Sequence, residues 1–119
     1  MKKYTEKEIK IINVYIGLRL RLARLQKNIS QQELSLLVSS EGVTIGRLER
    51  GEHFSSWALI FKLANTLNVT FIDLFQLQER EVLLQMKEEC FKLETKLNEK
   101  KINFYARYED IINALYLEQ

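Results

Sequence analysis

The sequence predicts an all-α protein. No proline and only four glycines occur among its 119 residues, and good helix formers such as Leu, Lys, Glu, Gln and Arg dominate. Alternating runs of Val, Ile and Thr between turn residues, which would indicate strands, are missing from the sequence. Hydrophobic residues make up 46% and charged residues 29%, which favours a globular chain over a disordered one. The length fits one domain, or a small domain with an extension.

Composition also limits where the chain works. No apolar run is long enough to span a bilayer, and the charged N-terminus is not typical of a secretory signal, so we expect no membrane partner. The single cysteine, Cys90, cannot form an intramolecular disulfide and fits a cytoplasmic location. One cysteine and one histidine, His53, cannot supply the usual zinc ligands. We therefore expect no metal and no cofactor.

Helix-start signals recur along the first 75 residues. Thr5-Glu6-Lys7-Glu8 and Ser30-Gln31-Gln32-Glu33 are capping boxes, in which a hydroxyl and a carboxylate bind free N–H groups at a helix start. They predict a first helix to about residue 27 and a second to about residue 38. Turn residues Ser39 and Ser40 then precede a third helix, 42–50.

The next helices follow the same logic. Gly51 suits the left-handed position that ends the third helix, and Asn68 suits the same position after a fourth helix capped by Ser55 and Ser56. Thr70 is expected to cap a short fifth helix. From residue 76 the pattern is helical almost to the end, with a break expected near 98–103.

The first helix carries two apolar stripes on nearly opposite sides, so it needs two partners. We expect the first stripe to face the five-helix core, and the second to face the C-terminal segment or another chain. The first stripe is Ile9, Ile12, Ile16, Leu20 and Ala23, and the second is Ile11, Tyr15, Leu18, Leu22 and Leu25.

The C-terminal segment offers a matching apolar seam in heptad steps. Packing on the first helix, within a chain or across a dimer, explains both features. A second apolar set follows it. The seam is Leu83, Met86, Cys90, Leu93 and Leu97, and the second set is Phe104, Tyr108, Ile111 and Leu115.

Charge is divided unevenly between the two parts. Residues 1–75 contain 11 Lys/Arg against 7 Asp/Glu, a net charge of +4, and residues 76–119 contain 7 against 9, a net charge of −2. The first part therefore approaches a polyanion such as DNA more easily than the second.

Residues 14–75 carry a series of short motifs at fixed spacing. They are Ile16-Gly17-x-Arg19-x-Arg21, Ser30-Gln31-x-Glu33-Leu34, Thr44-Ile45, Leu48-Glu49-Arg50-Gly51 and Leu63-Ala64-x-x-Leu67-x-Val69. Together, without gaps, they resemble the Cro/phage-repressor (XRE-like) helix-turn-helix family. The resemblance implies a five-helix repressor-like domain over 1–75, with 76–119 as a helical extension that serves dimerisation. Leu34 and Leu37 are expected to pack against Ile45 and Leu48.

The resemblance also implies a function and a set of site residues. A transcription regulator, more often a repressor than an activator, would bind double-stranded DNA of a roughly palindromic operator as a homodimer. The residues facing base edges would be Glu41, Gly42, Val43 and Arg47, the residues contacting phosphate Gln31 and Thr44, and the structural ion pair Arg24 with Glu49.

The chain departs from the family pattern at several of these positions. Ser39 stands where glycine is usual at the tight turn, and the loop after Gly51 contains no Lys or Arg. Gly42 offers no side chain, and Val43 can touch only a thymine methyl group. Glu41 can accept from a cytosine amino group, or it can cap the helix and repel phosphate, so Arg47 is the one strong reader. Arg47 itself has two interpretations, DNA contact or a solvated surface arginine. DNA contact is favoured, and the group contacted can be a phosphate or a base.

Three other side chains have plainer interpretations. His53 is expected to be an exposed loop residue, Trp57 a packing residue, and Cys90 a buried, inert thiol. The C-terminal tyrosines are expected in the core or in an interface.

The weak reading surface motivates an alternative from another class. In it the chain is an antitoxin-like or anti-regulator module that keeps the helix-turn-helix shape and binds a protein through Trp57, Phe54 or the C-terminal helices. No glycine-rich phosphate loop, paired nucleophile and base, or metal cluster occurs in the sequence, so we do not expect an enzyme.

Overall fold

The computed structural model describes residues 5–117, and these residues form helices and connecting turns only. The all-α class is thereby confirmed. The elements in chain order are α1 (Glu6–Gln26), α2 (Gln31–Leu37), α3 (Gly42–Arg50), α4 (Trp57–Leu67), the 3-10 helix η1 (Phe71–Leu74), α5 (Arg80–Leu93) and α6 (Glu99–Leu115).

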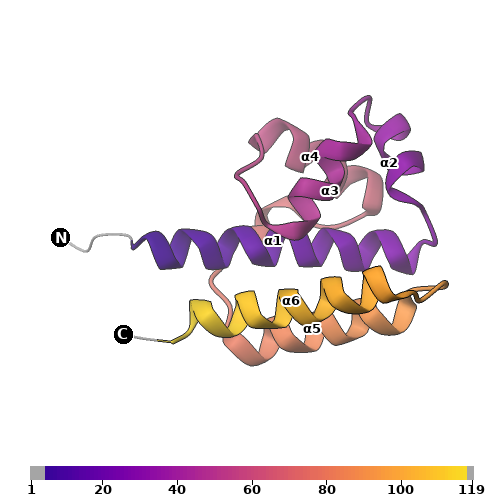
Figure 1. Ribbon diagram of the computed structural model, residues 1–119. Helices are drawn as coiled ribbons and strands as arrows, with labels where there is room; N and C mark the ends of the chain where they lie inside the picture. The colour runs from indigo at the N-terminus through magenta and orange to yellow at the C-terminus, as the bar shows by residue number, and fades with distance from the viewer. Residues whose placement is uncertain (1–4, 118–119) are drawn as a thin grey trace.

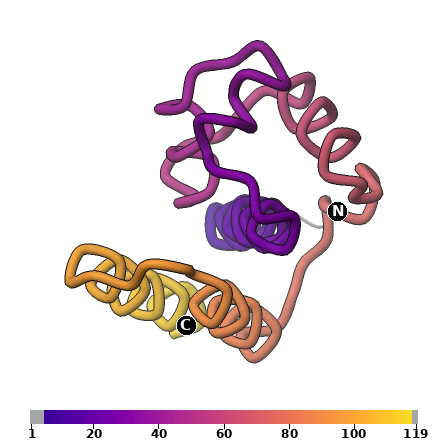
Figure 2. The backbone as a smooth tube through the Cα atoms, turned by 90° about the vertical axis from the view of Figure 1, so that its right-hand side faces the viewer, coloured from indigo at the N-terminus to yellow at the C-terminus, as the bar shows by residue number. Residues whose placement is uncertain are grey.

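Helix α1 lies between two layers of the molecule. Figure 1 shows α2, α3 and α4 on one side of α1, and the α5–α6 hairpin on the other. Viewed along α1 in Figure 2, the two layers lie on opposite sides of its axis. No helix within residues 5–117 is long and apolar enough to cross a membrane.

The two layers have separate apolar cores, and α1 contributes to both. The first predicted stripe packs with α2–α4 and η1 through Ile16, Leu20 and Ala23, and the second packs with α5 and α6 through Leu18 and Leu22. Both predicted faces of α1 are confirmed, and the second is covered by the same chain. Ile9 is an exception, because it is 39% exposed at the start of the helix.

Local capping fixes the helix boundaries as expected. Both capping boxes are present, at Thr5 and at Ser30. Gly51 and Asn68 adopt left-handed conformations, with φ of 67° and 62°, after α3 and α4. The expectation for Thr70 is wrong in detail, because its side chain makes no cap hydrogen bond and the element that follows is a 3-10 helix.

The turn between α2 and α3 holds a serine in a conformation that glycine prefers. Ser39 has a φ of 55°, in the left-handed region where a Cβ crowds the backbone. Just before this turn, Val38 is in the core at 5% exposure, and Leu37 is 63% exposed. The predicted contact of Leu37 with Ile45 and Leu48 is therefore wrong. Leu34 and Val38, which are four residues apart, form the inward side of this segment, and Leu37 lies off that side.

The C-terminal seam is only partly used. Leu83, Met86 and Cys90 are buried against α1, whereas Leu93 and Leu97 are 38% and 49% exposed. The reason is the position of the break, because α5 ends at Leu93 and the heptad does not continue.

Helix α6 differs from the sequence prediction in two ways. It starts earlier, and a slightly different set of its apolar residues faces the core. The break falls at 94–98 instead of 98–103, and Asn98 caps α6 by accepting from the Lys101 N–H at 2.8 Å. Tyr105, Tyr108 and Ile112 are buried, whereas Ile111 is 40% exposed. The apolar set of α6 is thus displaced by one residue at Ile111.

Helices α1 and α3 approach each other closely at Gly17. A Cβ added there would lie 2.3 Å from the carbonyl oxygen of Leu48 and 3.0 Å from that of Glu49, both of them backbone atoms. Only glycine allows this contact between the helices without a backbone shift.

We expect Gly17→Ala to lower the free energy of unfolding by about 1–3 kcal/mol, because α3 must move away from α1. Gly42→Ala is the matched control, since a Cβ there meets nothing within 4 Å and alanine favours a helix. Urea unfolding of both variants measures the difference. Equal stabilities of the two variants would contradict the close approach at Gly17.

Candidate nucleic-acid interface

One face of α3 is not covered by the rest of the described chain. Val43 is 63% exposed, and Glu41 and Arg47 are exposed as well. Arg47 forms no ion pair or hydrogen bond within residues 5–117. Glu41 occupies the N-cap of α3 without making a side-chain cap bond. Gly42 is half-buried, and a Cβ there would meet no other atom.

The predicted residues of this surface therefore lie together at the start and along one side of α3. Thr44 is half-buried beside them. Arg50 follows Arg47 by nearly one turn and pairs with Glu52 at 2.8 Å, and both of these side chains are exposed. Among the described residues of this face, Arg50 is paired and Arg47 forms no ion pair. The hydrogen bond from Arg50 and, to a smaller degree, the charge of Arg47 lower the pKa of Glu52.

Gln31 lies beside α3 and makes a contact that the sequence did not predict. Its Nε2 donates to Oε1 of Glu49 at 2.8 Å, and its Oε1 lies 3.5 Å from the position of a Cβ on Gly46. The absence of a side chain at Gly46 leaves room for this contact. The side chain of Gln31 is therefore held against α3, with one further N–H on Nε2 for an outside acceptor.

Glu49 is the centre of a buried ionic network. Its side chain is 1% exposed, and the predicted pair with Arg24 is present, with Arg24 Nε donating to Oε2 at 2.6 Å. Arg24 also donates to the carbonyl oxygen of Ile29 at 2.7 Å. A second arginine, Arg21, donates from Nη1 to Oε1 of Glu49 at 2.8 Å. These contacts join α1, α2 and α3.

Arg21 extends the network to the C-terminal hairpin. It donates from Nε to the Tyr105 hydroxyl at 2.9 Å and from Nη2 to Oε2 of Glu94 at 2.9 Å. Tyr105 itself donates to Glu94, and Lys101 pairs with the other Glu94 oxygen at 3.3 Å. One guanidinium thus links α3 to α5 and α6.

Sequence reasoning missed the role of Arg21. The available signal was its position: Arg21 stands one turn before Arg24 on α1, between the two apolar stripes. A charged residue that faces neither apolar partner on a helix covered from both sides requires a buried counter-charge. The identity of that counter-charge, 28 and 73 residues away, cannot be derived from local pattern.

Two opposing influences set the pKa values of the network. Burial disfavours the charged forms, and ion pairs and hydrogen bonds favour them. Burial lowers the pKa of Arg21, but the charge of Glu49 and the contacts with Tyr105 and Glu94 outweigh it, and the net pKa is raised. Burial raises the pKa of Glu94, but the hydrogen bond from Tyr105 and the charge of Arg21 bring it below its ordinary value. Arg21 and Glu94 are therefore both held in their charged forms.

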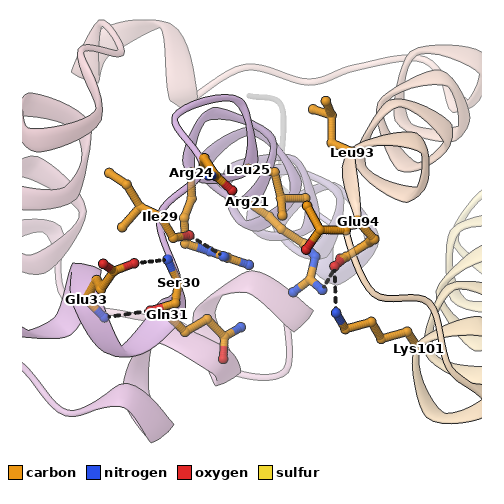
Figure 3. Close-up of a pocket in the computed structure, with 12 residues that line it drawn as sticks. Arg21, Arg24, Leu25, Ile29, Ser30, Gln31, Glu33, Leu93, Glu94 and Lys101 are labelled. Carbon is orange, nitrogen blue, oxygen red and sulfur yellow. Dashed lines mark hydrogen bonds and ion pairs between the residues drawn. The ribbon is translucent and has the colours of Figure 1, made fainter.

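A surface cleft of about 430 Å³ lies beside the network, between the end of α1, the start of α2 and the connection from α5 to α6. Figure 3 shows Arg21, Arg24, Gln31 and Lys101 pointing toward the same space from α1, α2 and α6. Glu94 is the acceptor at its hairpin side. The cleft connects the start of α2 to the start of α6.

The remaining expected residues fall in different places. His53 is exposed, as predicted. Cys90 is fully buried, and burial raises the pKa of its thiol to about 12. The packing expectation for Trp57 is wrong, because it is 69% exposed at the first position of α4. Phe54, three residues earlier in the chain, is 60% exposed.

Comparison with known proteins gives no family assignment, since the chain matches no protein-family model, no curated protein and no solved structure. Among the described residues, no three His, Cys, Asp or Glu side chains come together as metal ligands would.

We expect the ionised Glu94 to stabilise the protein in a pH-dependent way. Its carboxyl group titrates near 4.5 in the unfolded chain and lower in the folded one. The stability that it contributes is present above about pH 4.5 and is lost as pH falls through the lowered, folded-state pKa. Glu94→Gln should therefore be less stable than wild type at pH 7, with a gap that narrows as the pH falls below 4.5.

Urea unfolding between neutral pH and acid measures this gap. Glu99→Gln, at an exposed position in the first turn of α6, is the control for loss of one carboxylate. A gap between wild type and Glu94→Gln that stays constant with pH would contradict the role assigned to the ionised carboxylate.

Proposed function

We propose that this chain is a DNA-binding transcription regulator of the Cro/phage-repressor type, more often a repressor than an activator. In this proposal α2 and α3 form the helix-turn-helix, and α3 enters the major groove. The observation that carries it is the uncovered side of α3, where Val43 and the unpaired Arg47 project from the described chain.

The network behind α3 supports the same role. A helix that reads base edges must be held in a fixed orientation, because hydrogen bonds to bases require defined distances and angles. Glu49 provides this by binding Arg21, Arg24 and Gln31 on the side of α3 that faces the core. The reading side stays free.

The reading surface predicts modest sequence discrimination. Arg47 can donate two hydrogen bonds to guanine, which supplies about 1–3 kcal/mol, and Val43 can contact a thymine methyl group. Gly42 contributes no side-chain contact. DNA shape and a second subunit would then add to the specificity of the single arginine.

The operator would be roughly palindromic and bound by a homodimer. Leu83, Met86 and Cys90 are already buried within one chain, so they do not form the seam between subunits as the chain is folded here. The partner surface must use other residues. Exposed apolar side chains such as Leu36, Ile72 and Leu77 are available for it.

Arg47→Ala should weaken binding to the preferred operator by roughly 5- to 150-fold, the equivalent of one lost guanine contact of about 1–3 kcal/mol. The preferred duplex is obtained by selecting bound DNA from a random library at low salt, with the mass of the protein in solution recorded. Lys62→Ala, on α4, is the charge-matched control. Unchanged affinity of Arg47→Ala would rule out the assigned face.

A second candidate function rests on Phe54 and Trp57. Two aromatic side chains 60% and 69% exposed, one in the loop before α4 and one at its first position, are typical of a protein-interaction surface, because exposed aromatics are common hot spots. In this candidate the helix-turn-helix is kept for shape, and an antitoxin-like or anti-regulator module binds a protein partner.

The two candidates differ in which variant loses binding. If the aromatic pair binds a protein, Trp57→Ser should lose roughly 30-fold or more in affinity for the partner isolated with the wild type, as a hot spot of about 2 kcal/mol would, while Arg47→Ala keeps it. If the chain is a DNA regulator, Trp57→Ser retains operator affinity. Affinity measurements on the same purified variants distinguish the candidates.

A further inference from the structure

Helix α6 is attached to the end of α3. The Tyr108 hydroxyl donates to the backbone oxygen of Glu49 at 2.9 Å, and a Cβ on Gly51 would lie 3.6 Å from the same hydroxyl. Tyr108 is buried, at 2% exposure. The position of α6 is therefore fixed relative to the exposed face of α3.

Two surface hollows, which reach the start of α2 and the end of α3, lie along α6. At its start, Lys101 lines the cleft that also contains Gln31 and Arg24 (Figure 3). One and a half turns later, Arg107 lines a smaller hollow together with Arg50 and Glu52. Lys101 and Arg107 are about 9 Å apart along the helix axis, so α6 follows the edge of the surface from the start of α2 to the end of α3.

The charges along this edge favour a polyanion. Arg107 is exposed and forms no ion pair or hydrogen bond within residues 5–117. In its hollow, Arg50 and Arg107 face one carboxylate, Glu52. Around the cleft the charges balance, because Arg21 and Arg24 pair with the buried Glu49. Lys101 pairs with Glu94 and is the more exposed partner, at 34% against 5%.

The sequence on this flank of α3 explains why α6 matters. From Gly51 to Phe61 the chain has no Lys or Arg, so the loop after α3 brings no cation to a DNA backbone. Glu52 of that loop lies in the same hollow as Arg107. Arg107 of α6 therefore supplies a cation beside this loop, which has none of its own. Two acidic residues, Glu109 and Asp110, follow Arg107 within one turn, so the basic part of α6 ends there.

We propose that α6 is a second DNA-contacting element, in which Arg107 beside Arg50, and Lys101 beside Gln31, hold the phosphate backbone next to α3. This inference rests on the proposed function. It assigns the C-terminal hairpin a part in the binding surface, although residues 76–119 are net negative. The contacts are with phosphate and carry no base preference.

The test is the salt dependence of DNA affinity for the full chain. Fluorescence anisotropy with a labelled duplex of roughly 20 base pairs, one helical turn per half-site, is recorded over a series of KCl concentrations. Loss of one phosphate contact reduces the slope of log affinity against log salt by about 0.9 and weakens binding at 0.1 M salt by roughly eightfold. We expect this result for Arg107→Gln. Lys101→Gln is the second variant, with its melting temperature recorded because Lys101 also pairs with Glu94.

Two controls separate contact from general charge. Arg107→Lys keeps the cation and should keep the wild-type slope. Lys62→Gln removes one cation from the hollow between α2 and α4, which contains no residue of α3 or α6, and should also leave the slope unchanged.

The outcomes distinguish this inference from the proposed function. If the wild type binds, Arg47→Ala weakens binding, and Arg107→Gln has the same slope as Lys62→Gln, the inference about α6 is overturned and the regulator remains. If the wild type shows no salt-dependent DNA binding, both proposals are overturned.

Discussion

The side chain of Glu49 is 1% exposed, and an ionised carboxylate at that depth requires cations and hydrogen-bond donors around it. It receives them from Arg21 and Arg24 of α1 and from Gln31 of α2. Removing Glu49 would leave Arg24 buried without its carboxylate, and loss of one partner of a buried ion pair typically costs about 3–5 kcal/mol. The positions of α1 and α2 against α3 therefore depend on one another. The orientation of the exposed side of α3 follows from the same contacts.

Helix α1 transmits this constraint to the other half of the molecule. Arg21 lies between the two apolar stripes and binds Glu49 on one side and Glu94 on the other. Separating the hairpin from α1 would expose the core around Leu18 and would leave Glu94 without its buried cation. Gly17 brings α1 and α3 close enough for the short contacts of Arg21 to form. The hairpin is thus part of one cooperative structure and does not form an independent arm.

The sequence predicts the features that depend on neighbours in the chain. Capping at Thr5 requires only a hydroxyl and a carboxylate three residues apart, so pattern alone locates it. Leu37 and Ile111 face outward because packing decides which of two adjacent apolar residues faces the core. Their buried neighbours are Val38 and Ile112. Arg21 was missed for a related reason. Its partner Glu94 lies 73 residues away, and the chain folds between them in a way that no local spacing specifies.

The end of α3 shows how the hairpin can contribute to a binding surface. The last carbonyl groups of a helix lack partners inside it, and the buried Tyr108 hydroxyl donates to one of them, that of Glu49. Residue 49 is therefore held twice, by its side chain from α1 and α2 and by its backbone from α6. Helix α3 is held at its C-terminal end and is buried on its core side at Ile45, so its start presents Glu41 and Val43 on the opposite, exposed side. The C-terminal helices then act on α3 from within the same chain, and a second subunit would have to join through a different face.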